Sequence, residues 1–119
     1  AGVVIGAPPE VRSHDHRLHG LATTAPGVTI GDRNVIREYA QVHQGLSNTT
    51  VIGDDTFIMN QVYVAHDCLI ASDATIASSA LLAGHVTVGV GANIGLGVSV
   101  HQRVTIGALS MVGMGSVVT

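Results

Sequence analysis

The sequence predicts an all-β solenoid built from six-residue repeats, and three observations support this prediction. Around an aliphatic position that recurs every six residues, the next residue is usually Gly or Ala, and the fourth residue after the aliphatic is small or β-branched. The chain holds 15 glycines but only 3% aromatic residues, a composition typical of β-structure with many tight corners. Above all, an aliphatic side chain recurs at every sixth position, namely Ile52, Ile58, Val64, Ile70, Ile76, Leu82, Val88, Ile94, Val100, Ile106, Val112 and Val118.

The period of six favours strands because side chains alternate between the two faces of a strand, so an even period keeps the same face inward. A helix would instead repeat its apolar face at three and four residues. Each hexad is therefore expected to form a short strand and a corner, with successive coils about 4.8 Å apart. Ile30, Ile36 and Val42 show the same period in a shifted frame, which indicates a small insertion at 46–51.

The length predicts a single β-helix domain over residues 1–119. Residues 7–27 hold all three prolines and lack the hexad, so we expect a long loop there, and long loops in compact domains are often functional. No capping element flanks the repeats, and we expect the chain to be part of a longer protein.

The charge and hydropathy of the chain argue against nucleic-acid and membrane partners, and its single cysteine indicates the compartment. The formal net charge is −3, and the five basic residues are scattered arginines, so we expect no nucleic-acid binding. No apolar run approaches the ~20 residues of a transmembrane helix, and we expect no membrane insertion. Cys68 has no partner for an intrachain disulfide, which is typical of a cytoplasmic protein.

Four histidines are predicted to share one edge of the solenoid if a coil contains 18 residues. His43, His66, His85 and His101 then fall at nearly equivalent corner positions of successive coils, about 5 Å apart. An imidazole titrates near neutral pH and can take a proton from a hydroxyl or amine that attacks a thioester. The row therefore indicates an active site, and unrelated solvated corner histidines are the alternative.

Two neighbours of these histidines are further candidates. Asp67 follows His66, and its carboxylate either tunes the imidazole or faces solvent. Gly84 precedes His85, and its amide either stabilises a developing oxyanion or belongs to an ordinary corner glycine.

Four segments resemble motifs of the acyl-ACP:UDP-N-acetylglucosamine O-acyltransferase family in order and spacing: 30–45, 65–68, 82–86 and 100–102. This resemblance implies a left-handed parallel β-helix with three hexads per coil and a homotrimer with active sites between subunits. It implies an enzyme of lipid A biosynthesis that transfers an acyl group from acyl carrier protein to the 3-hydroxyl of a UDP-sugar. It implies no metal, and no cofactor besides acyl-ACP as donor.

The resemblance also implies roles for individual residues. His66 is the expected general base, and the Gly84 amide is expected to bind the thioester carbonyl. Met114 stands at the position that limits acyl length and would select a shorter chain, or else it fills a gap between subunits. The remaining candidates are expected to bind substrate: His85, His101, Gln102, His43, Asp67, and Asp15 and Arg17 in the 7–27 loop.

Three other functions stay open at this point. A hexapeptide-repeat transferase could use acetyl-CoA and another small acceptor with the same histidine base. A γ-class carbonic anhydrase binds a metal through three histidines, two of them five residues apart, whereas His66 and His85 are 19 apart. A non-catalytic scaffold would not depend on His66 for any turnover.

Overall fold

The computed structural model describes residues 1–13 and 26–119, so Asp15 and Arg17 lie outside the described residues. The described residues form sixteen short strands and no helix. All strand pairs are parallel, and they make three sheets, here named sheets I, II and III. Sheet I contains β1 (Val4–Ala7), β4 (Gln41–His43), β7 (Tyr63–Val64), β10 (Leu81–Leu82), β13 (Ser99–Val100) and β16 (Val117–Val118).

Sheets II and III have five strands each. Sheet II contains β2 (Val28–Ile30), β5 (Thr50–Ile52), β8 (Leu69–Ile70), β11 (Thr87–Val88) and β14 (Thr105–Ile106). Sheet III contains β3 (Val35–Ile36), β6 (Phe57–Ile58), β9 (Thr75–Ile76), β12 (Asn93–Ile94) and β15 (Met111–Val112).

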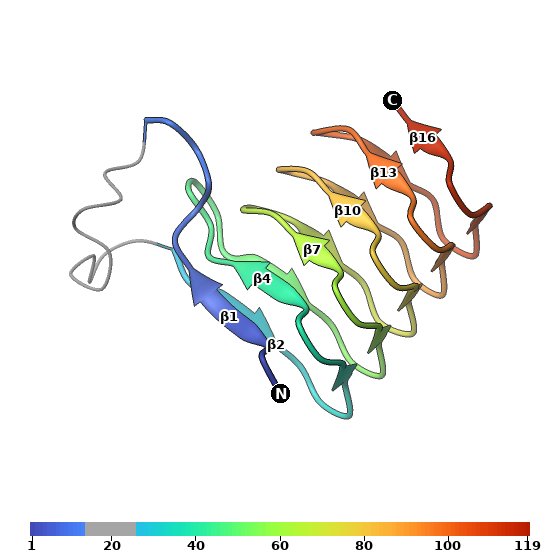
Figure 1. Ribbon diagram of the computed structural model, residues 1–119, viewed down its shortest axis with the longest axis horizontal. Coiled ribbons are helices and arrows are strands. Elements are labelled where there is room, and N and C mark those ends of the chain that lie inside the picture. The colour runs from blue at the N-terminus through green and yellow to red at the C-terminus, as the bar shows by residue number, and fades with distance from the viewer. Residues whose placement is uncertain (14–25) are drawn as a thin grey trace.

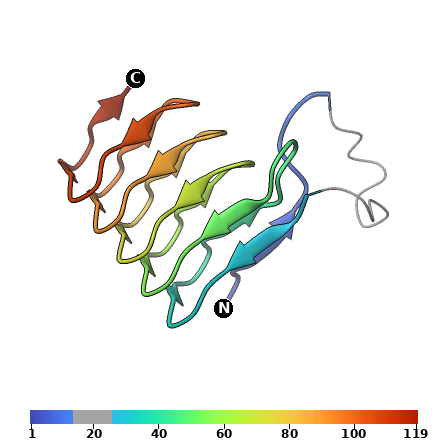
Figure 2. The ribbon, with the colours of Figure 1, turned by 180° about the vertical axis from the view of Figure 1, so that it is seen from behind.

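Each coil passes once through all three sheets, and from β5 onward a residue pairs with the residue 18 positions later. Leu82 pairs with Val100 in sheet I, and Val88 pairs with Ile106 in sheet II. Figures 1 and 2 show the resulting stack of coils from its two sides. The prediction of a parallel β-helix with three hexads per coil is therefore confirmed.

The hexad pattern explains why the interior is aliphatic. In most two-residue strands the second residue is buried and the first is more exposed, as in Thr75–Ile76 and Leu81–Leu82. Ile58, Ile76 and Ile94 follow one another in sheet III and are each 0% exposed. The apolar surface that these ladders remove from water is the main stabilising term of such a stack.

The corners share one backbone feature. The third residue after the inward aliphatic has a positive φ angle, for example 63° at Asp67 and 62° at His85. This left-handed conformation turns the chain sharply from one sheet to the next. It also directs the corner side chains away from the aliphatic interior, so that they can contact other polar groups or a ligand.

The regular coil is interrupted at two places in the N-terminal half of the chain. Residues 46–49 are exposed and protrude between β4 and β5. Thr50 and Val51 were expected in the insertion but belong to β5, because the strand resumes as soon as the extra residues have been accommodated. The expected 7–27 loop begins one residue later, since Ala7 ends β1.

The described residues include no helical segment with the length and hydropathy of a membrane span.

Candidate active site

The four predicted histidines all lie at the end of sheet I strands or just after them, in four successive coils. His43 ends β4, and His101 directly follows β13. His66 and His85 occupy the corners after β7 and β10, where the His85 amide donates to the His66 carbonyl over 3.1 Å. The rings of His66 and His85 meet edge to face with their centroids 5.3 Å apart. These two imidazoles form the centre of the site.

Asp67 lies beneath both rings rather than in solvent. Its side chain is 0% exposed, and its Oδ2 is 2.6 Å from His66 Nδ1. His85 Nε2 lies 3.6 Å from the same oxygen. With a proton on Nδ1 facing the carboxylate, the His66 ring keeps Nε2 free to accept a proton. Of the two possibilities that the sequence leaves open for Asp67, the geometry supports a partner of the imidazole.

The protruding residues 46–49 supply further donors to the Asp67 carboxylate. The Leu46 amide donates to Oδ2 over 3.0 Å and the Ser47 amide to Oδ1 over 2.9 Å. The Asn48 amide donates to Oδ1 as well. The Asp67 amide in turn donates to Thr50 Oγ1 over 3.0 Å. Three consecutive amides thus form an amide cradle (the backbone N–H groups of residues 46–48) around a buried negative charge.

The cradle sets the pKa of Asp67. Burial by itself raises the pKa of a carboxyl group, because it disfavours the charged form. Hydrogen bonds from the Asn48 amide, the His66 side chain and the Leu46 and Ser47 amides outweigh burial and lower the pKa of Asp67 to about 2. The carboxylate therefore stays ionised throughout the range in which an imidazole titrates.

Acid is expected to destabilise the protein through Asp67. A carboxyl group whose pKa is lower in the folded than in the unfolded chain adds stability above its unfolded pKa, near 4, and this contribution disappears as the pH falls through the folded value of about 2. The contribution is on the order of 2 kcal/mol. Urea unfolding at about pH 6 and about pH 2.5 should show a smaller fall in the free energy of unfolding for Asp67→Asn than for the wild type. Asp73→Asn, at an exposed corner, is the control, and equal falls in the wild type and Asp67→Asn would contradict the prediction.

Gly84 lies directly against the imidazole of His66. A Cβ atom on Gly84 would be 2.6 Å from His66 Cε1 and 2.7 Å from Nε2, closer than atoms in contact allow. Corners elsewhere carry larger residues at the equivalent position, such as Asn60 and Ser78, so the turn itself does not need glycine. Among the described residues, the Gly84 N–H has no hydrogen-bond acceptor. The glycine leaves room for the imidazole ring, and its own amide has no acceptor among the described residues.

His43 belongs to a second group one coil earlier. Its Nδ1 lies 2.9 Å from the Pro8 carbonyl, and its Nε2 lies 3.6 Å from Glu10 Oε1. The His43 ring is 5.0 Å from the Tyr63 ring. Burial first, and then the Glu10 carboxylate, raise the pKa of Tyr63 to about 12, which keeps its hydroxyl neutral. Sequence reasoning missed Glu10, because the segment from residue 7 has no hexad period that would assign it a register.

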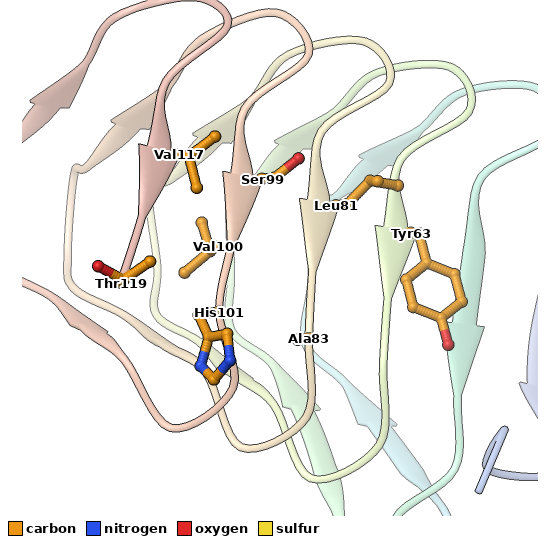
Figure 3. A pocket seen from close by; sticks show the side chains of 8 residues that line it. All are labelled: Tyr63, Leu81, Ala83, Ser99, Val100, His101, Val117 and Thr119. Carbon is orange, nitrogen blue, oxygen red and sulfur yellow. The ribbon is translucent and has the colours of Figure 1, made fainter.

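An open groove runs along the outer face of sheet I, with His101 among its lining residues. Its volume is about 340 Å³, and mostly aliphatic and small side chains line it. Figure 3 shows His101 at one side of the groove and Tyr63 at one end. The lining residues are Tyr63, Leu81, Ala83, Ser99, Val100, His101, Val117 and Thr119.

Two predicted site residues lie apart from the histidine pair. Gln102 is exposed in the corner after β13, and its carbonyl lies 3.4 Å from His101 Nδ1. Met114 is 74% exposed and follows β15 in sheet III, whose strands end at a different corner from those of sheet I. Within one subunit, the structure does not bring Met114 to the histidines.

The histidine pair and Asp67 also have the composition of a metal site. Ligand-type atoms of His66, Asp67 and His85 all lie within 4.8 Å of one another. Around Zn²⁺, bond lengths near 2.0–2.1 Å place tetrahedral ligand atoms roughly 3.3 Å apart. The 2.6 Å between His66 Nδ1 and Asp67 Oδ2 is instead a hydrogen-bond distance, and three amides already occupy the carboxylate. The geometry fits a hydrogen-bonded pair better than a metal centre.

Comparison with known proteins gives a consistent picture. Residues 49–84 match the family model of the bacterial transferase hexapeptide (six repeats). The acyl-[acyl-carrier-protein]–UDP-N-acetylglucosamine O-acyltransferase of Vibrio atlanticus is 49% identical over 49 residues, which are 39% of this chain and 18% of that protein. The chain thus spans less than one fifth of the length of this relative.

Solved structures extend the similarity to almost the whole chain. The UDP-N-acetylglucosamine acyltransferase from Campylobacter jejuni is 33% identical with a TM-score of 0.86, covering 97% of this chain and 43% of that one. The Arabidopsis enzyme of the same name is 34% identical with a TM-score of 0.86, covering 98% of this chain and 39% of that one. The predicted resemblance is therefore confirmed: this chain is a hexapeptide-repeat β-helix similar to UDP-N-acetylglucosamine acyltransferases over nearly all of its own length.

Proposed function

We propose that this chain carries the catalytic coils of an acyltransferase that moves an acyl group from acyl carrier protein to the 3-hydroxyl of a UDP-N-acetylglucosamine-type sugar nucleotide. One observation carries the proposal. The His66 imidazole is held through Nδ1 by a buried carboxylate, and its Nε2 edge packs against the backbone of Gly84, whose amide has no acceptor among the described residues. A base and an oxyanion donor side by side are what direct acyl transfer requires.

The proposed reaction needs no covalent enzyme intermediate. The sugar hydroxyl donates its proton to His66 Nε2 while its oxygen attacks the thioester carbon. The carbonyl oxygen gains negative charge and accepts a hydrogen bond from the Gly84 amide. When the tetrahedral intermediate collapses, the carbon–sulfur bond breaks, and the imidazolium returns its proton to the leaving thiolate. Asp67 stabilises the imidazolium between these two proton transfers.

The surrounding groups support binding rather than proton transfer. The aliphatic groove beside His101 suits the hydrocarbon of the acyl donor. His85, His43, His101 and Gln102 are proposed to bind substrate along the same edge of the coil stack as His66. Asp15 and Arg17 remain candidates for substrate contacts, and Met114 remains a candidate for limiting acyl length.

A homotrimer is part of the proposal. Large apolar side chains on the outer faces are exposed in the single chain, among them Leu69 at 44% and Met111 at 76%. Neighbouring subunits would remove such side chains from water, and they would bring Met114 of one subunit toward the histidines of the next. The proposed partners are acyl carrier protein and the UDP-sugar, and the proposed setting is lipid A biosynthesis in the cytoplasm.

The experiment is incubation of the protein with acyl-ACPs of graded chain length and UDP-N-acetylglucosamine, followed by mass spectrometry of the sugar nucleotide. We expect an O-acylated UDP-sugar, with a preference for shorter acyl chains if Met114 limits the groove. Acetyl transfer from acetyl-CoA without acyl-ACP turnover would indicate the alternative transferase. CO₂ hydration by protein that contains stoichiometric metal would indicate a carbonic anhydrase, and either result would overturn the proposal.

A further inference from the structure

We propose that the extrusion, defined as residues 46–49, is a positioning device for the base: its amides fix Asp67, and Asp67 fixes the His66 ring. This inference rests on the proposed role of His66. It assigns a catalytic purpose to a segment that reaches Asp67 through backbone amides and whose side chains form no hydrogen bond with the imidazole.

The coil itself does not need the extrusion. The amides of Gly45 and Thr50, which flank it, both donate to the Gly27 carbonyl, over 3.3 and 3.1 Å. The two ends of the extrusion therefore converge on one atom of the preceding coil. Without residues 46–49, Ile52 would again stand six positions after Val42, as in every later hexad.

The shortened corner would also carry suitable residues. Gly45 would take the third position after the aliphatic, where Asp67 and His85 have positive φ angles and where glycine is the most tolerant residue. Thr50 would take the inward position that it already occupies, fully buried. The coil could therefore continue in register without residues 46–49, so these four residues are not explained by the fold.

The contacts of the extrusion point to its purpose. Residues 46–49 are exposed on the surface, yet the amides of three of them converge on one carboxylate that is 0% exposed. A buried charge needs several donors to remain charged, and four hydrogen bonds with the His66 ring included leave Asp67 with one orientation. A fixed Asp67 selects the His66 tautomer with the proton on Nδ1 and aims Nε2 along Gly84.

Gly45 allows the extrusion to close. A Cβ atom there would lie 1.5 Å from the Asn48 carbonyl oxygen, so any side chain would push the segment away from Asp67. Gly27, in the preceding coil, has no described residue within 4 Å of its Cβ position. The chain thus offers a matched pair of glycine-to-alanine replacements, one that opens the cradle and one that leaves it intact.

The test compares the wild type, a deletion of residues 46–49, Asp67→Asn, and the combination of the two. We expect the deletion to keep a cooperative thermal transition and to lower kcat by about 10²-fold, with KM changing far less, because a misplaced base affects the chemical step. In the Asp67→Asn background the deletion should cost less than about threefold, since the extrusion acts through Asp67. Gly45→Ala should reproduce part of the loss, and Gly27→Ala should match the wild type.

A second readout does not require turnover. Nitrogen-15 chemical shifts of labelled histidine should show His66 protonated on Nδ1 in the wild type and a mixture of tautomers in the deletion and Gly45→Ala variants. If the wild type is inactive but the tautomer shift is found, the proposed function fails and the positioning inference stands. Full activity of the deletion variant, an equal loss with and without Asp67→Asn, an unchanged tautomer, or failure of the deletion variant to fold would each overturn the inference.

Discussion

Replacement of His66 by alanine is expected to lower kcat for acyl transfer by about 10²–10⁴-fold, the usual contribution of a positioned general base. KM for both substrates should change little, because the imidazole takes part in proton transfer more than in holding the ground state. Steady-state kinetics with an acyl-ACP and UDP-N-acetylglucosamine measures both constants. The loss should be smaller above about pH 9, where hydroxide can replace part of the base.

Ser79→Ala is the control, because Ser79 is an exposed corner residue that follows β9 in sheet III, away from the histidines. It should retain wild-type kcat. Equal turnover by wild type and His66→Ala would remove His66 from the mechanism and leave His85 as the next candidate base.

Gly84→Ala is expected to have the second largest effect, with kcat lowered by about 10²-fold, comparable to that of a 1 Å displacement of a catalytic group. The added methyl group would occupy the position where His66 Cε1 and Nε2 lie 2.6 and 2.7 Å away. The ring must therefore rotate away from Asp67, or the corner must shift and carry the Gly84 amide with it. The same kinetic assay detects either outcome as a fall in kcat.

Gly107→Ala tests whether corner glycines in general are sensitive. A Cβ atom at Gly107 would lie 3.4 Å from Ser110 Oγ, an ordinary contact, so activity and thermal midpoint should be close to those of the wild type. If Gly84→Ala also behaves like the wild type, the close approach of His66 is not needed for catalysis.

The regular part of this fold follows from the sequence because one physical rule governs it. Each aliphatic at the sixth position must face the interior, and Ile58, Ile70 and Ile76 are each 0% exposed as that rule requires. The equivalence of His66 and His85 follows as well, since stacking in register brings together residues about one coil apart. The hexad period, together with the three hexads per coil that the resemblance implies, was therefore sufficient to place these histidines along one edge.

The details of the site depend on the places where the period fails. The sequence indicates an insertion at 46–51, but it gives no register for the extra residues, so the three amides on Asp67 could not be foreseen. Glu10 escaped prediction for the same reason, because a segment without a repeat has no assigned neighbour. Gly84 was recognised as a possible donor, but its contact with the His66 ring depends on side-chain direction, which a hexad count does not supply.

The left-handed corners have a consequence for how such a protein can change over time. In residues 1–13 and 26–119, ten residues other than glycine take positive φ angles, and they include arginine, tyrosine, aspartate, serine, histidine and leucine. The corner positions thus accept many types of side chain at a modest conformational cost. The buried aliphatic positions accept only a few types, because the interior is closely packed. New functional groups can therefore appear along one edge of the coil stack by single corner substitutions that leave the buried aliphatic residues unchanged. Conversely, Leu109→Gly, at a corner away from the histidines, should raise the thermal stability, because glycine adopts a positive φ angle without a steric penalty. Asp67 and His85 would not be affected.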